Sequence, residues 1–247
     1  MSLLPNLRKL SLNPMNSYSS PLFRQTLLAL VLTLAILSGA PDPSIHASEE
    51  QIDSLKCTRC HRFDKTQDPK NGPDLFFAGN KFQKDWLIGF LQAPEVIRKA
   101  GPSADPGFLK GQPEYQPPHP SVKKEDALSL ADFLMSLKLD NLEPVAVNPE
   151  PLSKVEKVKT KILFERDHSC IACHESVNLV GNPRGGISGP SLLTAGNRLQ
   201  ASWVYLWLKQ PETFQPKSRM PRAHLDEKAL INLTRYVLSH KKDSSKP

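Results

Sequence analysis

The chain has 247 residues, of which 39% are hydrophobic, and its 32 basic and 25 acidic residues give a formal charge of +7. This mild excess, with no basic cluster interleaved with aromatic residues, excludes a nucleic-acid-binding protein as the leading interpretation. Four cysteines in two widely separated pairs would also staple so long a chain poorly, which argues against a disulfide scaffold.

Residues 1–47 have the pattern of an export signal. Arg24 precedes an apolar stretch over 26–37, and small residues follow up to Ala47, after which we expect cleavage; cleavage after Ala40 is the alternative. The apolar stretch is shorter than the roughly 20 residues that span a bilayer. We therefore expect a periplasmic protein, with an uncleaved leader that touches the membrane as the alternative.

Every cysteine lies in one of two Cys-x-x-Cys-His pentapeptides, formed by Cys57, Cys60 and His61 and by Cys170, Cys173 and His174. Two thiols at this spacing can bond the two vinyl groups of one porphyrin, and the adjacent histidine can then ligate the iron. A four-cysteine zinc site would not require the histidines, and a thioredoxin-like site would need a βαβ pattern that is missing. The sequence therefore predicts two covalently bound haem c groups, with His61 and His174 as metal ligands.

Past each pentapeptide the sequence repeats itself. Eleven of the 24 positions in 72–95 are identical, without a gap, to those in 189–212. The shared residues include Gly72-Pro73 and Gly189-Pro190, Ala78-Gly79-Asn80 and Ala195-Gly196-Asn197, Gln83 and Gln200, and Trp86 and Trp203. The chain is thus expected to hold two copies of one domain of about 100 residues.

Each copy is expected to be helical, and no sustained alternating strand pattern is present. Ser48 and Ser153, each with Gln or Glu three residues on, predict N-caps of helices that lead into the pentapeptides. Further helices are expected over 83–92, 123–137, 200–210 and 226–240, from their apolar spacing and from the prolines that follow the middle ones. A proline-rich linker over 139–152 would separate domain 1 (48–138) from domain 2 (153–240), and 241–247 would form a polar tail.

This order of elements resembles a class I cytochrome c in each half, so the expected fold is all-α, with two tandem class I cytochrome c-like domains. The resemblance implies that the carbonyls of Pro73 and Pro190 orient the two histidines. It also makes Trp86 and Trp203 candidates for contact with haem propionates, with core packing as the alternative. Asn80 and Asn197 would bond a propionate or cap a turn, and the sequence leaves both open.

The two halves differ in the expected sixth iron ligand. Met220, followed by Pro221 shortly before the last helix, resembles the distal-methionine loop of class I cytochromes. The first half carries about sixteen extra residues after Glu95 and no methionine until Met135, which is expected in the core. His119, between two prolines, is the natural ligand there; a surface histidine or an open five-coordinate iron are the alternatives.

Because a thioether raises the reduction potential relative to a second imidazole, the first haem is expected to have the lower potential. The function expected from the resemblance is an electron carrier that passes single electrons between redox proteins. A diheme peroxidase, or an electron-transfer subunit of a larger periplasmic oxidoreductase or respiratory complex, are the alternatives.

Overall fold

The computed structural model describes residues 50–68, 70–101, 118–140, 142–148, 150–178, 180–216 and 218–242, all of which belong to one compact unit. The export signal, the N-cap expected at Ser48, most of the extra segment of the first half and the end of the tail lie outside these residues.

The described part is mostly helical, which confirms the expected helical class. In the first half a helical turn over 50–54 is followed by a 3-10 helix, Cys57–Arg59, and by α3 (Ala78–Lys81), α4 (Lys84–Gln92) and α5 (Lys124–Ser136). The second half repeats this order with α6 (Lys154–Ile162), a π-helical turn Leu163–Asp167, a 3-10 helix Cys170–Ala172, α7 (Ala195–Arg198), α8 (Ala201–Lys209), a 3-10 helix Pro211–Thr213 and α9 (Glu227–Leu238).

Local chemistry explains where α6 and α9 of the second half begin. Ser153 accepts a hydrogen bond from the Glu156 backbone N–H while the Glu156 carboxylate accepts one from the Ser153 N–H, so α6 starts with the expected capping box. The Asp226 carboxylate caps α9 by accepting from the Ala229 N–H.

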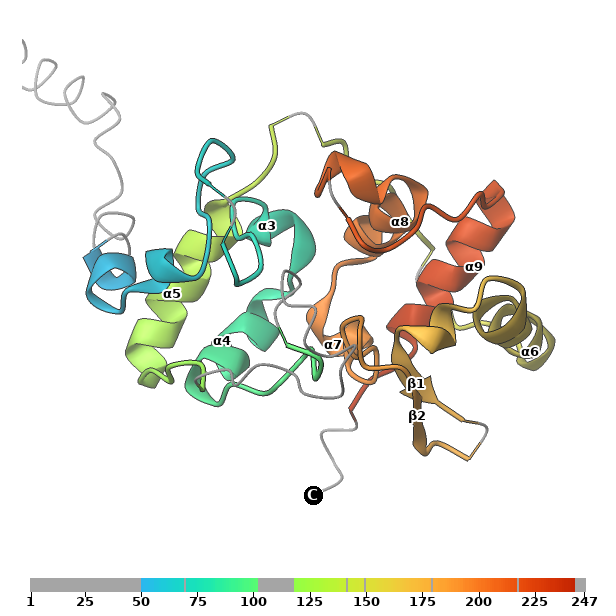
Figure 1. Ribbon diagram of the computed structural model, residues 1–247. Helices are drawn as coiled ribbons and strands as arrows, with labels where there is room; N and C mark the ends of the chain where they lie inside the picture. Colours follow the sequence, from blue (N-terminus) through green and yellow to red (C-terminus); the bar gives the residue numbers. More distant parts are fainter. Residues whose placement is uncertain are drawn as a thin grey trace, which may run out of the picture. The chain divides into compact units, whose positions relative to one another are not determined.

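The long helices bury the apolar faces that their spacing predicts. In α9 these residues are Leu230, Leu233, Tyr236 and Val237, each at most 5% exposed. In α5 the corresponding face contains Leu130, Phe133 and Leu134. Helix α4 packs on α5 and α8 packs on α9, so the same pair of helices forms a core in each repeat (Figure 1).

A short hairpin in the second half was not expected from the sequence. Strands β1 (Glu175–Val177) and β2 (Pro183–Gly185) pair antiparallel directly after His174. Strands of three residues are too short to produce an alternating pattern, which is why periodicity does not detect them.

The two repeats meet through a reciprocal set of hydrogen bonds around Phe82 and Leu199, which form an isolated antiparallel bridge. The Gln83 N–H donates to the Arg198 carbonyl at 2.9 Å, and the Gln200 N–H donates to the Lys81 carbonyl at 2.9 Å. Because the same positions of each repeat contact the other, the contact has the isologous form of a two-fold interface.

The side chains of the two glutamines extend this contact. Gln83 Nε2 donates to the carbonyls of Gly196 and Leu199 at 3.0 and 2.9 Å. Gln200 Nε2 donates to the carbonyls of Gly79 and Phe82 at 2.9 and 2.6 Å. The repetition of glutamine at these positions therefore has a structural reason, since each side chain donates hydrogen bonds to two backbone carbonyls of the other repeat.

Candidate functional site

Both pentapeptides adopt the same local structure. The residue before the first cysteine, Lys56 or Ser169, has a left-handed backbone with φ of 56° and 52°, and a 3-10 turn then carries the two cysteines. Non-glycine residues seldom adopt this conformation, so the matching strain indicates that each loop is held in place by its surroundings. All four cysteines are unpaired thiols; burial raises the pKa of Cys57 and of Cys170, while Cys60 and Cys173 are exposed.

The adjacent histidines have equivalent settings. The Nδ1 of His61 donates to the Pro73 carbonyl at 2.7 Å, and that of His174 donates to the Pro190 carbonyl at 2.8 Å. A carbonyl can only accept, so Nδ1 carries the proton and Nε2 keeps its lone pair in both rings. Burial lowers the pKa of both histidines, which favours the neutral imidazole that binds metals.

The glycine before each proline makes this hydrogen bond possible. A Cβ on Gly72 would lie 2.8 Å from the His61 ring, and one on Gly189 would lie 2.6 Å from the His174 ring. The N–H of each glycine also donates to the carbonyl of the second cysteine, at 2.7 Å. The Gly-Pro pair thus leaves room for the imidazole and fixes its orientation.

His119 and Met220 occupy matching places against the middle helices. The His119 ring centroid lies 6.1 Å from that of His61 and 5.2 Å from that of Phe90. Met220 Sδ accepts a hydrogen bond from Trp207 Nε1 at 3.0 Å. Since Phe90 and Trp207 are equivalent in the gap-free alignment of the repeats, the two candidate distal residues contact the same position of their domains.

The tryptophan and asparagine candidates make protein contacts. Trp203 is 3% exposed, stacks on Phe77 with centroids 4.9 Å apart and packs on Phe214, while Trp86 packs between Phe82 and Phe90. The amide oxygens of Asn80 and Asn197 accept hydrogen bonds from the backbone N–H groups of Leu139 and Lys242, just after the last helix of each repeat.

Two basic residues, a part-buried lysine and a buried arginine, were missed at the sequence level. Lys81 and Arg198 hold equivalent positions next to the interface between the repeats, and burial lowers their pKa values to about 8 and about 10. The Lys81 Nζ lies over the rings of Phe82 and Trp203, and Arg198 Nε is buried without a hydrogen-bond partner in the described chain. Isolated basic residues in a sequence give no sign that folding will bury them.

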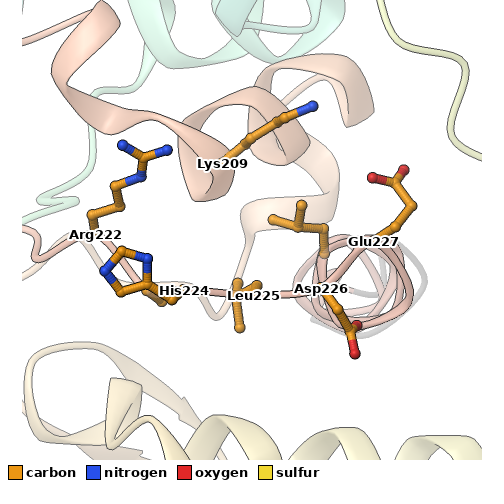
Figure 2. Close-up of a pocket in the computed structure, with 8 residues that line it drawn as sticks. Lys209, Arg222, His224, Leu225, Asp226 and Glu227 are labelled. Carbon is orange, nitrogen blue, oxygen red and sulfur yellow. The ribbon is translucent and has the colours of Figure 1, made fainter.

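Two further histidines of the described chain, His240 and His224, lie outside the two candidate sites. The ring nitrogens of His240 contact the Ser176 hydroxyl and the Val237 carbonyl. His224 lies on a hollow of about 420 Å³ that Lys209, Arg222, Asp226 and Glu227 also line (Figure 2). The acidic groups there serve the fold, since Asp226 caps α9 and Glu227 accepts from the Tyr205 hydroxyl, so we assign the hollow no ligand.

Comparisons of the chain with family models, curated proteins and solved structures gave no match. Among the described residues, no three His, Cys, Asp or Glu side chains gather closely enough to hold a metal ion by themselves. The described helices also include none with the length and apolar character of a membrane span.

Proposed function

We propose that the protein is an exported diheme c-type cytochrome that passes single electrons between redox proteins. The observation that carries the proposal is the duplicated arrangement of two unpaired thiols beside an imidazole whose Nδ1 is fixed by a proline carbonyl. When bound, haem iron supplies reversible one-electron chemistry.

The residues present fit haem better than a bare metal ion. A porphyrin brings four nitrogen ligands with it, so the chain has to add only one or two, which agrees with the lack of a larger ligand cluster among the described residues. Cys57 and Cys60, and likewise Cys170 and Cys173, would form the thioether bonds, and the Nε2 atoms of His61 and His174 would ligate iron. The carboxylates of haem are also suitable partners for buried cations such as Arg198. The Nε of this residue is buried and has no hydrogen-bond partner among the described groups.

The distal residues differ between the repeats, and the geometry at His119 favours a ligand role. If haem iron is held by two histidines, each would supply one ring nitrogen, so the two rings must lie close together. The rings of His61 and His119 lie 6.1 Å apart, and the His119 Nδ1 donates to Pro120, which leaves Nε2 for a metal. We propose His/His ligation in the first repeat and His/Met ligation through Met220 in the second, with the lower potential in the first.

The test is expression of the full chain in a bacterium with a haem c maturation system, followed by intact mass and a pyridine haemochrome spectrum. Two haems per chain are expected, on Cys57 and Cys60 and on Cys170 and Cys173. The variant Cys170→Ala/Cys173→Ala should retain one. A colourless protein with the mass of the bare polypeptide would refute the proposal.

A peroxidase would behave differently from a carrier. If reduction of the second haem displaced His119 and the protein then turned over hydrogen peroxide, the enzyme alternative would replace the carrier. For a carrier, we expect both irons to stay six-coordinate through the redox cycle and no peroxide turnover above that of free haem.

A further inference from the structure

Residues 97–101 of the first repeat contact the segment that follows His174 in the second repeat, and we call them the strap. The Ile97 carbonyl accepts from the Ser191 N–H at 2.7 Å, and the Ala100 N–H donates to the Ile187 carbonyl at 3.3 Å. Ala100 is fully buried. These contacts on both sides of Arg98 and Lys99 hold the two basic residues beside the segment that follows His174.

The residues that follow the two proximal histidines explain why the second site needs the strap. After His61 comes Arg62, whose guanidinium forms a two-pronged ion pair with Asp74 at 2.7 and 2.5 Å, within its own repeat. After His174 comes Glu175, only 8% exposed, whose carboxylate accepts from the Ser191 hydroxyl at 3.0 Å. The cation that Glu175 lacks in its own repeat is Lys99 of the strap, with Nζ 2.7 Å from Oε1.

Lys99 neutralises Glu175, so Arg98 adds a second positive charge beside this site. Its Nε is buried and has no hydrogen-bond partner in the described part of the chain. The guanidinium interacts electrostatically with His174, Cys173 and Arg219, of which His174 is the candidate proximal ligand and Arg219 directly precedes Met220.

We propose that Arg98 of the first repeat tunes the second redox site, where its charge raises the reduction potential of the group held by Cys170, Cys173 and His174. This inference rests on the proposed function. A nearby positive charge disfavours the oxidised iron, which carries one more positive charge than the reduced iron, and partial burial limits screening by salt. The fold of one repeat would then set the potential of the other and widen the gap between them.

The test compares Arg98→Gln with Arg98→Lys in the full holoprotein, by redox titration followed in the absorption band of methionine-ligated ferric haem. We expect Arg98→Gln to increase the ferric-to-ferrous ratio of the second haem several-fold at fixed potential, where tenfold corresponds to 59 mV. The potential of the first haem should be unchanged. Arg98→Lys keeps the positive charge, so the second haem of this variant should keep a potential close to that of the wild type. Lys154→Gln, which removes an exposed charge at the start of α6, is the control and should move neither potential.

An unchanged second potential in an Arg98→Gln protein that carries both haems would overturn this inference and leave the proposed function intact. An equal loss with Arg98→Lys would also overturn it, because the contact rather than the charge would then matter. If the wild-type protein carries no haem on Cys170 and Cys173, the proposed function itself fails.

Discussion

A glycine next to a histidine ring controls the ring's orientation in each repeat. Gly72→Ala would place a methyl group 2.6 Å from the Cys60 carbonyl and 2.8 Å from the His61 ring, which must then leave Pro73 or displace the loop. We expect a loss of about 1–3 kcal/mol in the free energy of unfolding, as for other overpacked sites, together with a changed spectrum of the first haem. Denaturant titration and absorption spectra of the holoprotein measure both.

Gly89 provides the matched control for that substitution. A Cβ there would meet nothing within 4 Å, and the residue lies on the exposed side of α4. Gly89→Ala should therefore stabilise the protein by about 0.5–1 kcal/mol, because alanine loses less backbone entropy in a helix. Equal effects of the two substitutions would contradict the close fit at His61.

His119 can be tested without reference to potentials. We expect His119→Ala to open the first iron, so that the reduced variant binds carbon monoxide at one haem per chain, whereas the wild type binds none. His224→Ala, which removes an exposed histidine from the other repeat, should leave the protein unable to bind the gas. Carbon monoxide binding by the unaltered protein would show that the first iron is open rather than ligated by His119.

At the scale of elements, the interface between the repeats depends on two glutamine side chains. Gln83→Ala leaves two backbone carbonyls of the other repeat without their donor, and Gln200→Ala does the same in reverse. Each should cost about 1–3 kcal/mol in unfolding free energy, measured by denaturation of the holoprotein. The double variant should lose less unfolding free energy than the sum of the two single losses, because both side chains belong to the same interface.

Gln92 is the control for these substitutions, because its Nε2 donates to the Ile88 carbonyl of its own helix rather than to the other repeat within the described chain. Gln92→Ala should change the unfolding free energy by less than about 0.5 kcal/mol. A cost for Gln83→Ala as small as that of Gln92→Ala would show that the reciprocal hydrogen bonds contribute little.

The end of α9 is held to the hairpin by His240, and this contact should depend on pH. Burial lowers the pKa of His240; its backbone hydrogen bonds to Val237 and Tyr236 oppose this, and the charges of Lys157 and Lys161 lower the pKa further. The ring also bonds the Ser176 hydroxyl and packs edge-on against Tyr236. The folded state therefore keeps the imidazole neutral at pH values where the unfolded chain, with a pKa of about 6.5, already binds a proton. The stability from His240 is complete above about pH 6.5 and is lost as the pH falls below it.

Unfolding free energies at pH 7.5 and 5.5 measure this loss, and the variant H240F/S176A separates it from the titration of carboxylates. The variant removes both polar partners together, so no buried hydroxyl is left unpaired. We expect the stability of the variant to fall less than that of the wild type between the two pH values. Parallel profiles would exclude His240 as the source.

The repeated motifs predict that the halves share a helical fold, but their physical reasons become visible only in three dimensions. Gly79 and Gly196 recur because a Cβ would collide with the carbonyls of Met135 and Leu238 at the ends of the last helices. The strap is undetectable in the sequence, since a contact between Lys99 and Glu175 follows no periodicity. Helical spacing reports on neighbours within an element, whereas contacts between repeats depend on how whole elements are placed.

At the scale of the whole molecule, the fold joins two nearly equal repeats and then makes their sites unequal. The reciprocal glutamines are symmetric, whereas the distal residues, the residue after each proximal histidine and the strap are not. If haem is bound, the distal residues and the strap favour a higher potential in the second repeat, because both a thioether and an added positive charge favour ferrous iron. The first repeat would then pass electrons to the second.

A redox titration of the holoprotein should therefore resolve two separate one-electron steps. Met220→Ala should lower only the higher of the two potentials and abolish the absorption band of methionine-ligated ferric haem. Met135→Leu is the control, because Met135 packs half-buried against the core and a volume-conserving change there should leave both potentials in place. A single step for both haems, or a shift of the lower potential in Met220→Ala, would mean that the unequal distal residues do not direct the electron.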